Sequence, residues 1–496
     1  MRNVSTRMAA VAGLCCLLLA TACTTDGSGT SDSKPDGGDS GPGIAESFDS
    51  RFTGNEEFCR PAADAPDEAP KATAPGITAD EVVIANIRLK IEDLEKVGFA
   101  FDNGDQADQA QVFVDYINDK CGGINGRKLK LETIAQPVPG FGGDPEVEAQ
   151  QTCTKVADEL HAVVAFSYSG VGNPLASCLS GPKKTGFVTT YDLGKRDFAQ
   201  ADGRLFSVNH SPENILKYAA LEMVDELKGK KVGVVYGDQD PNGQVVQEGL
   251  VATLEDEGVD VARVDALGCA DGKCTEGLIP SVQGMRSDKV DVVFPLLDTI
   301  NLPTYLREMV TQGFKPGDVQ FVNSSFMAQD SELVTGKMVE FGGKEAGELY
   351  DGATIWSGSR AGEHRIDGFE PDPFVAMCNE TYAANSTKVT KPYDQYEDED
   401  NRRASSVASH CAGVRMLARA IEAAGANPTR EDIYEVLGNF GKFDHGEGLP
   451  ASFRPGKPTG PDAVVREKFS FPCKLKVSNA VGHCIEPVSD FLPLPD

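Results

Sequence analysis

Residues 117–129 read Ile117-Asn118-Asp119-Lys120-Cys121-Gly122-Gly123-Ile124-Asn125-Gly126-Arg127-Lys128-Leu129. An amphipathic segment that predicts a helix over residues 106–118 ends here, and an apolar segment that predicts a strand over residues 128–134 begins. The glycines between them supply the positive φ values that a tight turn requires. The stretch therefore predicts helix, turn and strand in direct succession, which is the repeating step of an α/β fold.

The same alternation continues outward from this stretch, with short β-branched apolar runs separated by amphipathic ones. Strands are predicted over residues 81–89, 128–134, 162–167, 186–192, 231–237, 259–266, 290–297 and 319–324. Helices are predicted over residues 106–118, 145–159, 212–227, 243–257 and 302–311. Such a run exceeds what one hydrophobic core usually holds, so we expect two α/β lobes with a passage between them near residues 205–210.

The rhythm changes after the last of these strands. A strand-like run at residues 349–356 is followed by helical segments at 373–384, 403–424 and 430–437, and then by a Pro/Gly-rich tail with a strand pair around Cys473 and Cys484. Helices without strands between them do not start a third sheet, so they are predicted to complete the first lobe. The predicted parts are a signal peptide at 1–22, a flexible tether at 23–50, an N-terminal extension at 51–79, lobe 1 at 80–206, lobe 2 at 207–352, a return to lobe 1 at 353–445 and a C-terminal segment on lobe 2 at 446–496.

The N-terminus has the features of an export signal. Arg2 and Arg7 precede an apolar run at residues 8–20, which ends in Ala20-Thr21-Ala22-Cys23 and is too short to span a bilayer. The pattern resembles the bacterial lipoprotein signal, in which the cysteine becomes the first residue and is diacylated, although Ala20 stands where that signal usually has Leu. We therefore expect lipidation at Cys23 and anchoring at the extracytoplasmic face of the membrane. Secretion with an unmodified Cys23 is the alternative.

Cysteine content agrees with an exported protein. Of thirteen cysteines, Cys15 and Cys16 leave with the signal and Cys23 carries lipid, and the remaining ten are Cys59, Cys121, Cys153, Cys178, Cys269, Cys274, Cys378, Cys411, Cys473 and Cys484. An even number in an exported chain favours disulfides over zinc, because no CxxC pair is present and the six histidines are scattered. Sequence does not fix the connectivity. We expect 269–274 and 473–484 across short loops, 153–178 between neighbouring helices, and 59–121 and 378–411 by elimination.

The formal net charge of −29 excludes some classes of partner. A surface this acidic repels nucleic acid and anionic lipid, so no nucleic-acid partner is expected. The acidic run at residues 394–400 is interpreted as a solvated loop and not as a metal site. No cofactor or metal is predicted.

Three stretches carry a resemblance to a known family. They are the run Pro75-Gly76-Ile77-Thr78-Ala79-Asp80-Glu81-Val82-Val83-Ile84, the helix start Gly104-Asp105-Gln106, and the helix end, glycine turn and strand of residues 117–129. In this order they resemble the leucine/isoleucine/valine-binding type of solute receptor. The similarity covers the order of elements over about residues 76–440.

The resemblance implies a type I periplasmic-binding-protein fold, with two doubly wound α/β lobes joined by a three-strand hinge and a ligand held in the cleft between them. Such a cleft lies beyond the carboxyl ends of the strands. The family uses a serine that aligns with Ser169 to hold an amino-acid carboxylate, and that role is carried over; the alternative is that Ser169 only caps the next helix. The predicted ligand-binding residues are Tyr168, Ser169, Gly170, Thr190, Tyr191, Asp192, Asn242, Asp298 and Ser324.

The cleft loops depart from the amino-acid pattern, because the acid that would pair with an α-ammonium group is missing near Ser324. Asp192, Asp240 or Asp298 could replace it. The ligand is therefore predicted only as a small polar compound: an amino acid, or else a polyol, amide, peptide or aromatic acid. Residues 238–243 also fit the first half of a calcium loop, but position twelve is Gly249, so a polar strand-to-helix turn is preferred.

The predicted function is capture of a small ligand and its delivery to an ABC permease. A ligand sensor that signals to a membrane receptor is the main alternative, since the same fold and anchor would serve it. An enzyme is disfavoured, because the chain has no HExxH motif and no GxSxG elbow after a strand.

Overall fold

The computed structural model describes residues 50–62, 68–92, 102–138, 144–169, 172–270, 272–366, 368–388, 401–475 and 481–494. The chain divides into Met1–Gly41 and Pro42–Asp496, and everything below concerns the second unit. The predicted signal peptide, most of the predicted tether, the predicted lipidation site Cys23, the candidate ligand residue Gly170 and the acidic run at 394–400 lie outside the described residues. Within the described part, no helix combines the length and apolar character needed to cross a membrane.

The first sheet is formed by five parallel strands in the order β2-β1-β3-β4-β5. They are β1 (Glu81–Leu89), β2 (Lys128–Gln136), β3 (Val164–Ser167), β4 (Gly186–Thr189) and β5 (Leu205–Ser207). Both faces are covered, so β3, β4 and β5 are buried along their whole length, whereas β2 at the edge alternates between exposed and buried residues. Val82 and Ile84 pack into one core and Val83, Ala85 and Ile87 into another, as the alternation of side chains along a strand requires.

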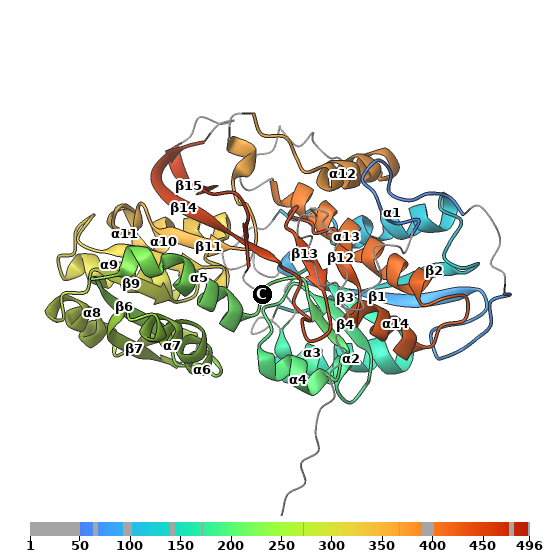
Figure 1. Cartoon of the computed structure of the whole chain (residues 1–496), viewed down its shortest axis with the longest axis horizontal. Helices are drawn as coiled ribbons and strands as arrows, with labels where there is room; N and C mark the ends of the chain where they lie inside the picture. The colour runs from blue at the N-terminus through green and yellow to red at the C-terminus, as the bar shows by residue number, and fades with distance from the viewer. Residues whose placement is uncertain are drawn as a thin grey trace, which may run out of the picture. The chain divides into compact units, whose positions relative to one another are not determined.

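Helices cover the two faces of this sheet (Figure 1). The core of Val82 and Ile84 is shared with α1 (Gln106–Asp119), α12 (Pro373–Asn385), α13 (Asn401–Ala423) and α14 (Arg430–Gly438). The opposite core is shared with α2 (Pro145–Thr154), its π-helical continuation η2 (Lys155–Glu159), α3 (Asn173–Ser180) and α4 (Lys195–Ala201). Helices α12, α13 and α14 therefore pack against the first sheet, in the lobe to which residues 373–437 were predicted to return.

The second sheet has the order β15-β14-β11-β10-β9-β6-β7-β8, with β16 beside β14. Its strands are β6 (Lys231–Gly237), β7 (Asp260–Ala270), β8 (Lys273–Glu276), β9 (Val292–Leu296), β10 (Gln320–Ser324), β11 (Thr354–Ser357), β14 (Ala463–Lys474), β15 (Val481–Pro487) and β16 (Leu492–Pro493). The pairs from β7 to β11 are parallel, whereas β8, β14, β15 and β16 pair antiparallel to their neighbours.

Helices also cover both faces of the second sheet. One core contains α5 (Pro212–Leu227), α6 (Asn242–Val246), the π-helical η3 (Gln247–Val251) and α7 (Ala252–Asp256). The other contains α8 (Leu278–Ser287), α9 (Asn301–Thr311), α10 (Glu332–Gly342) and α11 (Lys344–Tyr350).

The predicted domain boundaries need two corrections. The strand predicted at 349–356 is Thr354–Ser357, because Leu349 and Tyr350 end α11 and Gly352 turns the chain with a φ of +85°. This strand belongs to the second sheet, so residues 353–445 do not return to lobe 1 as a whole. The tail at 446–496 is also divided: β14 to β16 extend the second sheet, whereas β13 (Ala451–Phe453) pairs with β12 (Gly441–Phe443) and packs into the first core.

Three segments cross between the sheets, and this connectivity matches the predicted hinge. They run from β5 to α5, from β11 to α12 and from β13 to β14. The first and third are paired side by side through the parallel bridge of Ser207 with Thr459. The Ser207 N–H donates to Pro458 O at 3.0 Å, and the Gly460 N–H donates to Ser207 O at 2.7 Å.

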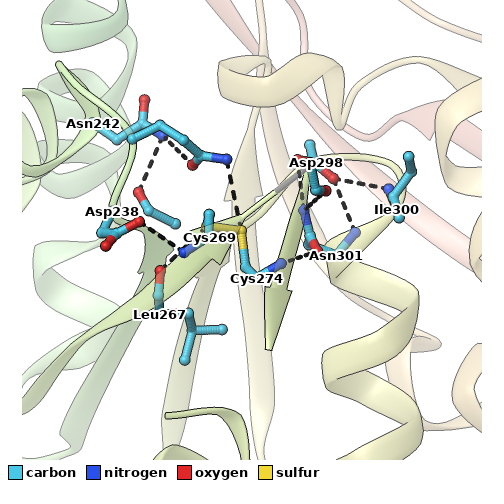
Figure 2. Close-up of a disulfide and its surroundings, with 11 residues drawn as sticks. Asp238, Asn242, Leu267, Cys269, Cys274, Asp298, Ile300 and Asn301 are labelled. Atoms are coloured by element: carbon cyan, nitrogen blue, oxygen red, sulfur yellow. Dashed lines mark hydrogen bonds between the residues drawn. A yellow bond between two sulfur atoms is a disulfide. The ribbon is translucent and has the colours of Figure 1, made fainter. Parts of the chain in front are cut away.

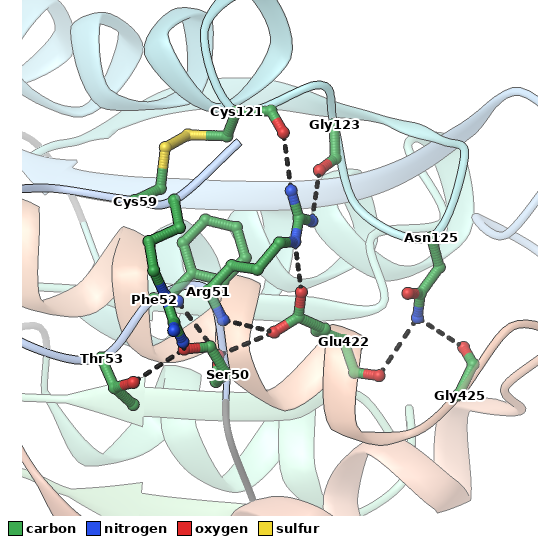
Figure 3. Close-up of polar contacts among 11 residues, drawn as sticks. Ser50, Arg51, Phe52, Thr53, Cys59, Cys121, Gly123, Asn125, Glu422 and Gly425 are labelled. Carbon is green, nitrogen blue, oxygen red and sulfur yellow. Dashed lines mark hydrogen bonds and ion pairs between the residues drawn. A yellow bond between two sulfur atoms is a disulfide. The ribbon is translucent and has the colours of Figure 1, made fainter. Parts of the chain in front are cut away.

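The glycine turn after α1 is held by Arg51, which also forms an ion pair with α13 (Figure 3). Gly122, Gly123 and Gly126 have φ values of 78°, 72° and 78°, as predicted for this turn. Arg51, from the N-terminal extension, donates to Cys121 O at 2.6 Å and to Gly123 O at 2.9 Å, and it pairs with Glu422 of α13 at 2.7 Å. The extension is thus an integral part of the first lobe.

All five predicted disulfides are present: Cys59–Cys121, Cys153–Cys178, Cys269–Cys274, Cys378–Cys411 and Cys473–Cys484. The second joins the ends of α2 and α3, and the fourth joins α12 to α13. Each bond links residues of one lobe.

Candidate functional site

A cavity of about 390 Å³ lies where the three crossing segments pass between the lobes. The first lobe contributes residues that follow β3 and β4 and one face of α13: Tyr168, Thr190, Ser405, Ser406 and Ser409. The second lobe contributes residues that follow β10, which are Ser325, Asp330, Ser331 and Glu332, and the segment that crosses from β11 to α12 contributes Ser359, Arg360 and Glu363. The first and third crossing segments add Val208, Asn209, His210 and Pro461, and the loop between β12 and β13 adds His445, Glu447 and Leu449. The position agrees with the rule that ligands bind beyond the carboxyl ends of parallel strands.

Of the predicted ligand residues, Tyr168 and Thr190 line this cavity. Ser169 does not, because its hydroxyl donates to Gln106 Oε1 at 3.0 Å, at the start of α1. Gly170 lies outside the described residues.

The other two predicted residues after β4 lie behind the lining. The Tyr191 carbonyl accepts a hydrogen bond from Ser207 at 3.1 Å, and its ring packs against the core between the first sheet and α3. Asp192 accepts from Asn209 Nδ2 at 3.5 Å, and Asn209 itself lines the cavity. Burial, with the nearby charge of Asp330, raises the pKa of Asp192 to about 7.

Asn242 and Asp298 serve local structure around the Cys269–Cys274 disulfide (Figure 2). Asn242 donates to Gly237 O at 3.2 Å. Asp298 accepts from the Ile300 and Asn301 N–H groups, each at 2.9 Å, at the start of α9. Such side chains satisfy the free N–H groups of a turn or helix start, which explains polar residues at the ends of β6 and β9 without a ligand.

The loop considered for calcium is likewise a polar turn. Asp238 accepts from the Cys269 N–H at 2.9 Å, and Asp240 forms an exposed ion pair with Arg196 at 3.4 Å. The last predicted residue, Ser324, is fully buried and accepts from the Phe326 N–H at 3.2 Å, whereas the next residue, Ser325, lines the cavity.

The most prominent feature of the lining is a group of carboxyls that the sequence analysis did not select: Asp330, Glu332, Glu363 and Glu447. Burial raises the pKa of Asp330, although the Ser357 hydroxyl donates to it at 2.6 Å. Burial and the charge of Asp330 together raise the pKa of Glu447 to about 7. Burial raises the pKa of Glu363 to about 7 as well, against the opposing effect of Arg360, which lies 3.3 Å away.

The two histidines of the lining are neutral at physiological pH. Burial lowers the pKa of His210 to about 3 and that of His445 to about 4. Each directs Nε2 at a carbonyl, His210 at Ala463 O (3.1 Å) and His445 at Val208 O (3.2 Å), so that nitrogen carries the proton. Both histidines therefore stabilise the segments that cross between the lobes, and neither adds positive charge to the cavity.

Tyr168 occupies its place because α13 has a glycine opposite it. A Cβ at Gly413 would lie 2.4 Å from Tyr168 Cε2. The ring also lies 5.9 Å from the ring of His410, and the Tyr168 hydroxyl is buried without a hydrogen-bond partner among the described residues. Burial raises the pKa of this hydroxyl, which therefore stays protonated.

The model of one family, described as periplasmic binding protein, matches residues 98–466, which is more than half of the chain. The chain belongs to the periplasmic binding protein family. The resemblance identified from residues 75–129 is thereby confirmed.

Solved structures of this family agree on the fold, which is the type I periplasmic-binding-protein fold, as predicted. A solute-binding protein of an ABC transporter from Rhodopseudomonas palustris HaA2, in complex with p-hydroxybenzoic acid, has a TM-score of 0.56 at 14% identity, covering 84% of this chain and 98% of that chain. A fatty acid ABC transporter substrate-binding protein from Thermomonospora curvata has a TM-score of 0.55 at 16% identity, with coverages of 87% and 97%. A putative branched-chain amino acid ABC transporter from Rhodospirillum rubrum has a TM-score of 0.52 at 14% identity, with coverages of 78% and 97%.

No curated protein matches the chain. The names of these solved relatives refer to an aromatic acid, a fatty acid and a branched-chain amino acid. Membership of the periplasmic binding protein family therefore does not specify a ligand, and its class has to be argued from the cavity itself.

Proposed function

We propose that the protein is the solute receptor of an ABC transporter, lipid-anchored through Cys23 at the extracytoplasmic face of the membrane. It captures a small polar ligand between its lobes and delivers it to a permease. The observation that carries this proposal is the polar cavity of about 390 Å³ at the crossing segments, in a chain of the periplasmic binding protein family. No catalytic role is proposed.

Capture works by closure of the two lobes. Tyr168 and Thr190 offer ligand contacts on the first lobe, and Ser325 and Asp330 offer them on the second. A ligand that contacts both groups binds the closed form more tightly than the open form, and that difference drives closure. The crossing segments act as the hinge, and the permease recognises the closed form.

Of the residues predicted from the sequence, Tyr168 and Thr190 are proposed as direct contacts. Ser169 is proposed to position the start of α1 through its hydrogen bond to Gln106 and not to contact the ligand. Asp192 is proposed to act through Asn209 in the same way.

Thermal unfolding of the mature chain with Cys23→Ser tests the proposal. The panel contains amino acids, amides, small peptides, polyols, aromatic acids and amines. A ligand present at a hundred times its dissociation constant adds about 2.7 kcal/mol to the free energy of unfolding, which raises the midpoint measurably.

A matched pair of variants locates the binding site. Ser325→Trp fills the cavity and should abolish the shift, whereas Ser287→Trp, at the exposed end of α8, should leave it intact. Equal shifts in both variants would place binding elsewhere, and no shift with any compound would contradict a receptor function.

A further inference from the structure

We infer that the ligand is a small organic cation that also carries hydroxyl or amide groups, held between carboxylates of the two lobes. This inference rests on the proposed receptor function and names the class of compound that the same cavity takes.

Carboxyl groups reach the cavity from several elements. Asp330 follows β10 in the second lobe, and Glu447 lies between β12 and β13, beside the first lobe. The charge of Asp330 acts on Asp192 and Glu447, and on Glu467 of β14 as well. Acids from both lobes are therefore close enough to repel one another across the cavity.

These acids lack enough positive partners within the described residues. Glu363 pairs with Arg360, and Glu332 pairs with Arg365. The carboxylate of Glu447, in contrast, has no hydrogen bond or ion pair in the described part of the chain. Glu467 lies outside the lining and is fully buried; its Oε1 accepts from the Ala361 N–H at 2.7 Å, and burial with the charge of Asp330 raises its pKa well above the ordinary value, so it stays protonated. A carboxylate in such surroundings is stabilised when a positive charge compensates it, so a cationic ligand fits this lining better than a neutral or anionic one.

The basic side chains near the cavity already interact with other groups of the protein. Arg360 pairs with Glu363 and lies over the ring of Phe491, 5.4 Å from its centroid. Lys457, in the third crossing segment, donates to the carbonyls of Ser452 and Gly460, each at 2.8 Å, and so is held by the backbone. With both lining histidines neutral, the ligand remains as the source of positive charge.

The cavity fits an organic cation better than a metal ion. Among the described residues, the group of side chains with metal-ligand spacing is Cys473, Cys484 and Glu486, whose sulfurs form a disulfide; the cavity acids form no such group. A volume of about 390 Å³ exceeds what a single ion or water fills, since one water occupies about 30 Å³ in the liquid. Serine hydroxyls from α13 and from the loops after β10 and β11 supply partners for neutral polar groups of the ligand.

The charge arrangement also couples binding to closure. Approach of the lobes brings Asp330 toward the acids of the first lobe, and this costs free energy while the cavity is empty. A cation placed between them converts that repulsion into attraction on both sides. A neutral compound of the same shape does not.

Matched pairs of probes test the inference on the mature Cys23→Ser chain by thermal unfolding and calorimetry. The pairs are glucosamine with glucose, choline with 3,3-dimethylbutan-1-ol, and putrescine with 1,4-butanediol; calcium and magnesium chlorides are added alone. We expect a cationic member to raise the midpoint and to bind at least about ten-fold more tightly than its neutral partner.

Charge-neutral variants place the effect in the cavity. Asp330→Asn and Glu447→Gln should each weaken binding of the cationic probe at least about ten-fold, without lowering the unfolding midpoint of the unliganded protein. Asp225→Asn, a surface acid whose side chain is 92% exposed, should leave affinity unchanged.

A neutral or anionic compound that shifts the midpoint when no cation does would overturn the inference and keep the receptor function. A shift caused by calcium or magnesium alone would overturn the organic character of the ligand. No shift with any compound of either panel would overturn the receptor function itself.

Discussion

Replacement of Glu447 by Gln should stabilise the unliganded protein by an amount that grows between about pH 4.5 and pH 7 and is complete above pH 7. The folded chain raises the pKa of Glu447 from its ordinary value of 4.5 to about 7, through burial and the charge of Asp330. The folded protein therefore holds a proton at Glu447 in a pH range in which the unfolded chain has released it. Stability then falls as pH rises from about 4.5 to about 7.

The size of the effect follows from the two pKa values. Each pH unit between them corresponds to about 1.4 kcal/mol, so complete removal from solvent would make the charged Glu447 cost about 3 kcal/mol above pH 7. Because the side chain lines a cavity that water reaches, we expect about 2 kcal/mol. Gln keeps the shape of the side chain without its charge, so Glu447→Gln should recover this amount at pH 8 and almost nothing at pH 4.5.

Thermal unfolding of the unliganded protein at the two pH values measures the effect. In a chain of this length, about 2 kcal/mol corresponds to a midpoint shift of about 2–4 °C. The exposed control Asp225→Asn should show no gain at pH 8. An equal effect of Glu447→Gln at both pH values would mean that the carboxylate is not destabilised by its surroundings, and the electrostatic description of the cavity would fail.

Three further predictions concern the framework of the site. Arg51→Ala removes the 2.7 Å partner of the partly buried Glu422, which keeps the Ser50 hydroxyl as a donor, and should destabilise the first lobe by about 2 kcal/mol in thermal unfolding; an unchanged midpoint would contradict this. Gly413→Ala places a methyl group 2.4 Å from the ring of Tyr168 and should weaken ligand binding about ten-fold by calorimetry while the far-ultraviolet circular dichroism stays unchanged. Cys178→Ser opens a disulfide with a sequence separation of 25 and should cost about 3 kcal/mol in thermal unfolding; the difference from the unmodified chain should disappear when reducing agent opens the disulfides of both proteins.

Sequence reasoning succeeded where local pattern and tertiary environment agree. The strands β1 and β6 and the helix α5 have the predicted bounds, because continuous β-branched runs suit strands buried on both faces and a Ser-Pro start suits a helix N-terminus. β11 was placed too early, because the apolar residues that end α11 run directly into it. α8 was not predicted, since Pro and Gly interrupt the sequence of residues 278–287.

The candidate site was harder to predict than the fold. Asn242 and Asp298 stand at strand ends, where polar residues serve a turn as readily as a ligand, and the structure gives them hydrogen bonds within the turn. Glu363 and Glu447 come from the second crossing segment and from the tail, which meet only through the connectivity of the two lobes. No local sequence pattern indicates that these two acids line the same cavity. The sequence does offer one signal for Glu363, which is an acid shortly after a strand. Using that signal requires the end of β11 to be predicted correctly.

The disulfides and the carboxylates together explain how closure can depend on a ligand. Each of the five bonds is confined to one lobe, so within the described chain the lobes are connected covalently only by the three crossing segments. Cross-links of this kind stiffen each lobe and leave their relative motion free. Opposed carboxylates such as Asp330 and Glu447 then bias the unliganded receptor toward the open form. A cation that neutralises them removes this bias, so the same charge that selects the ligand also signals that the receptor is loaded.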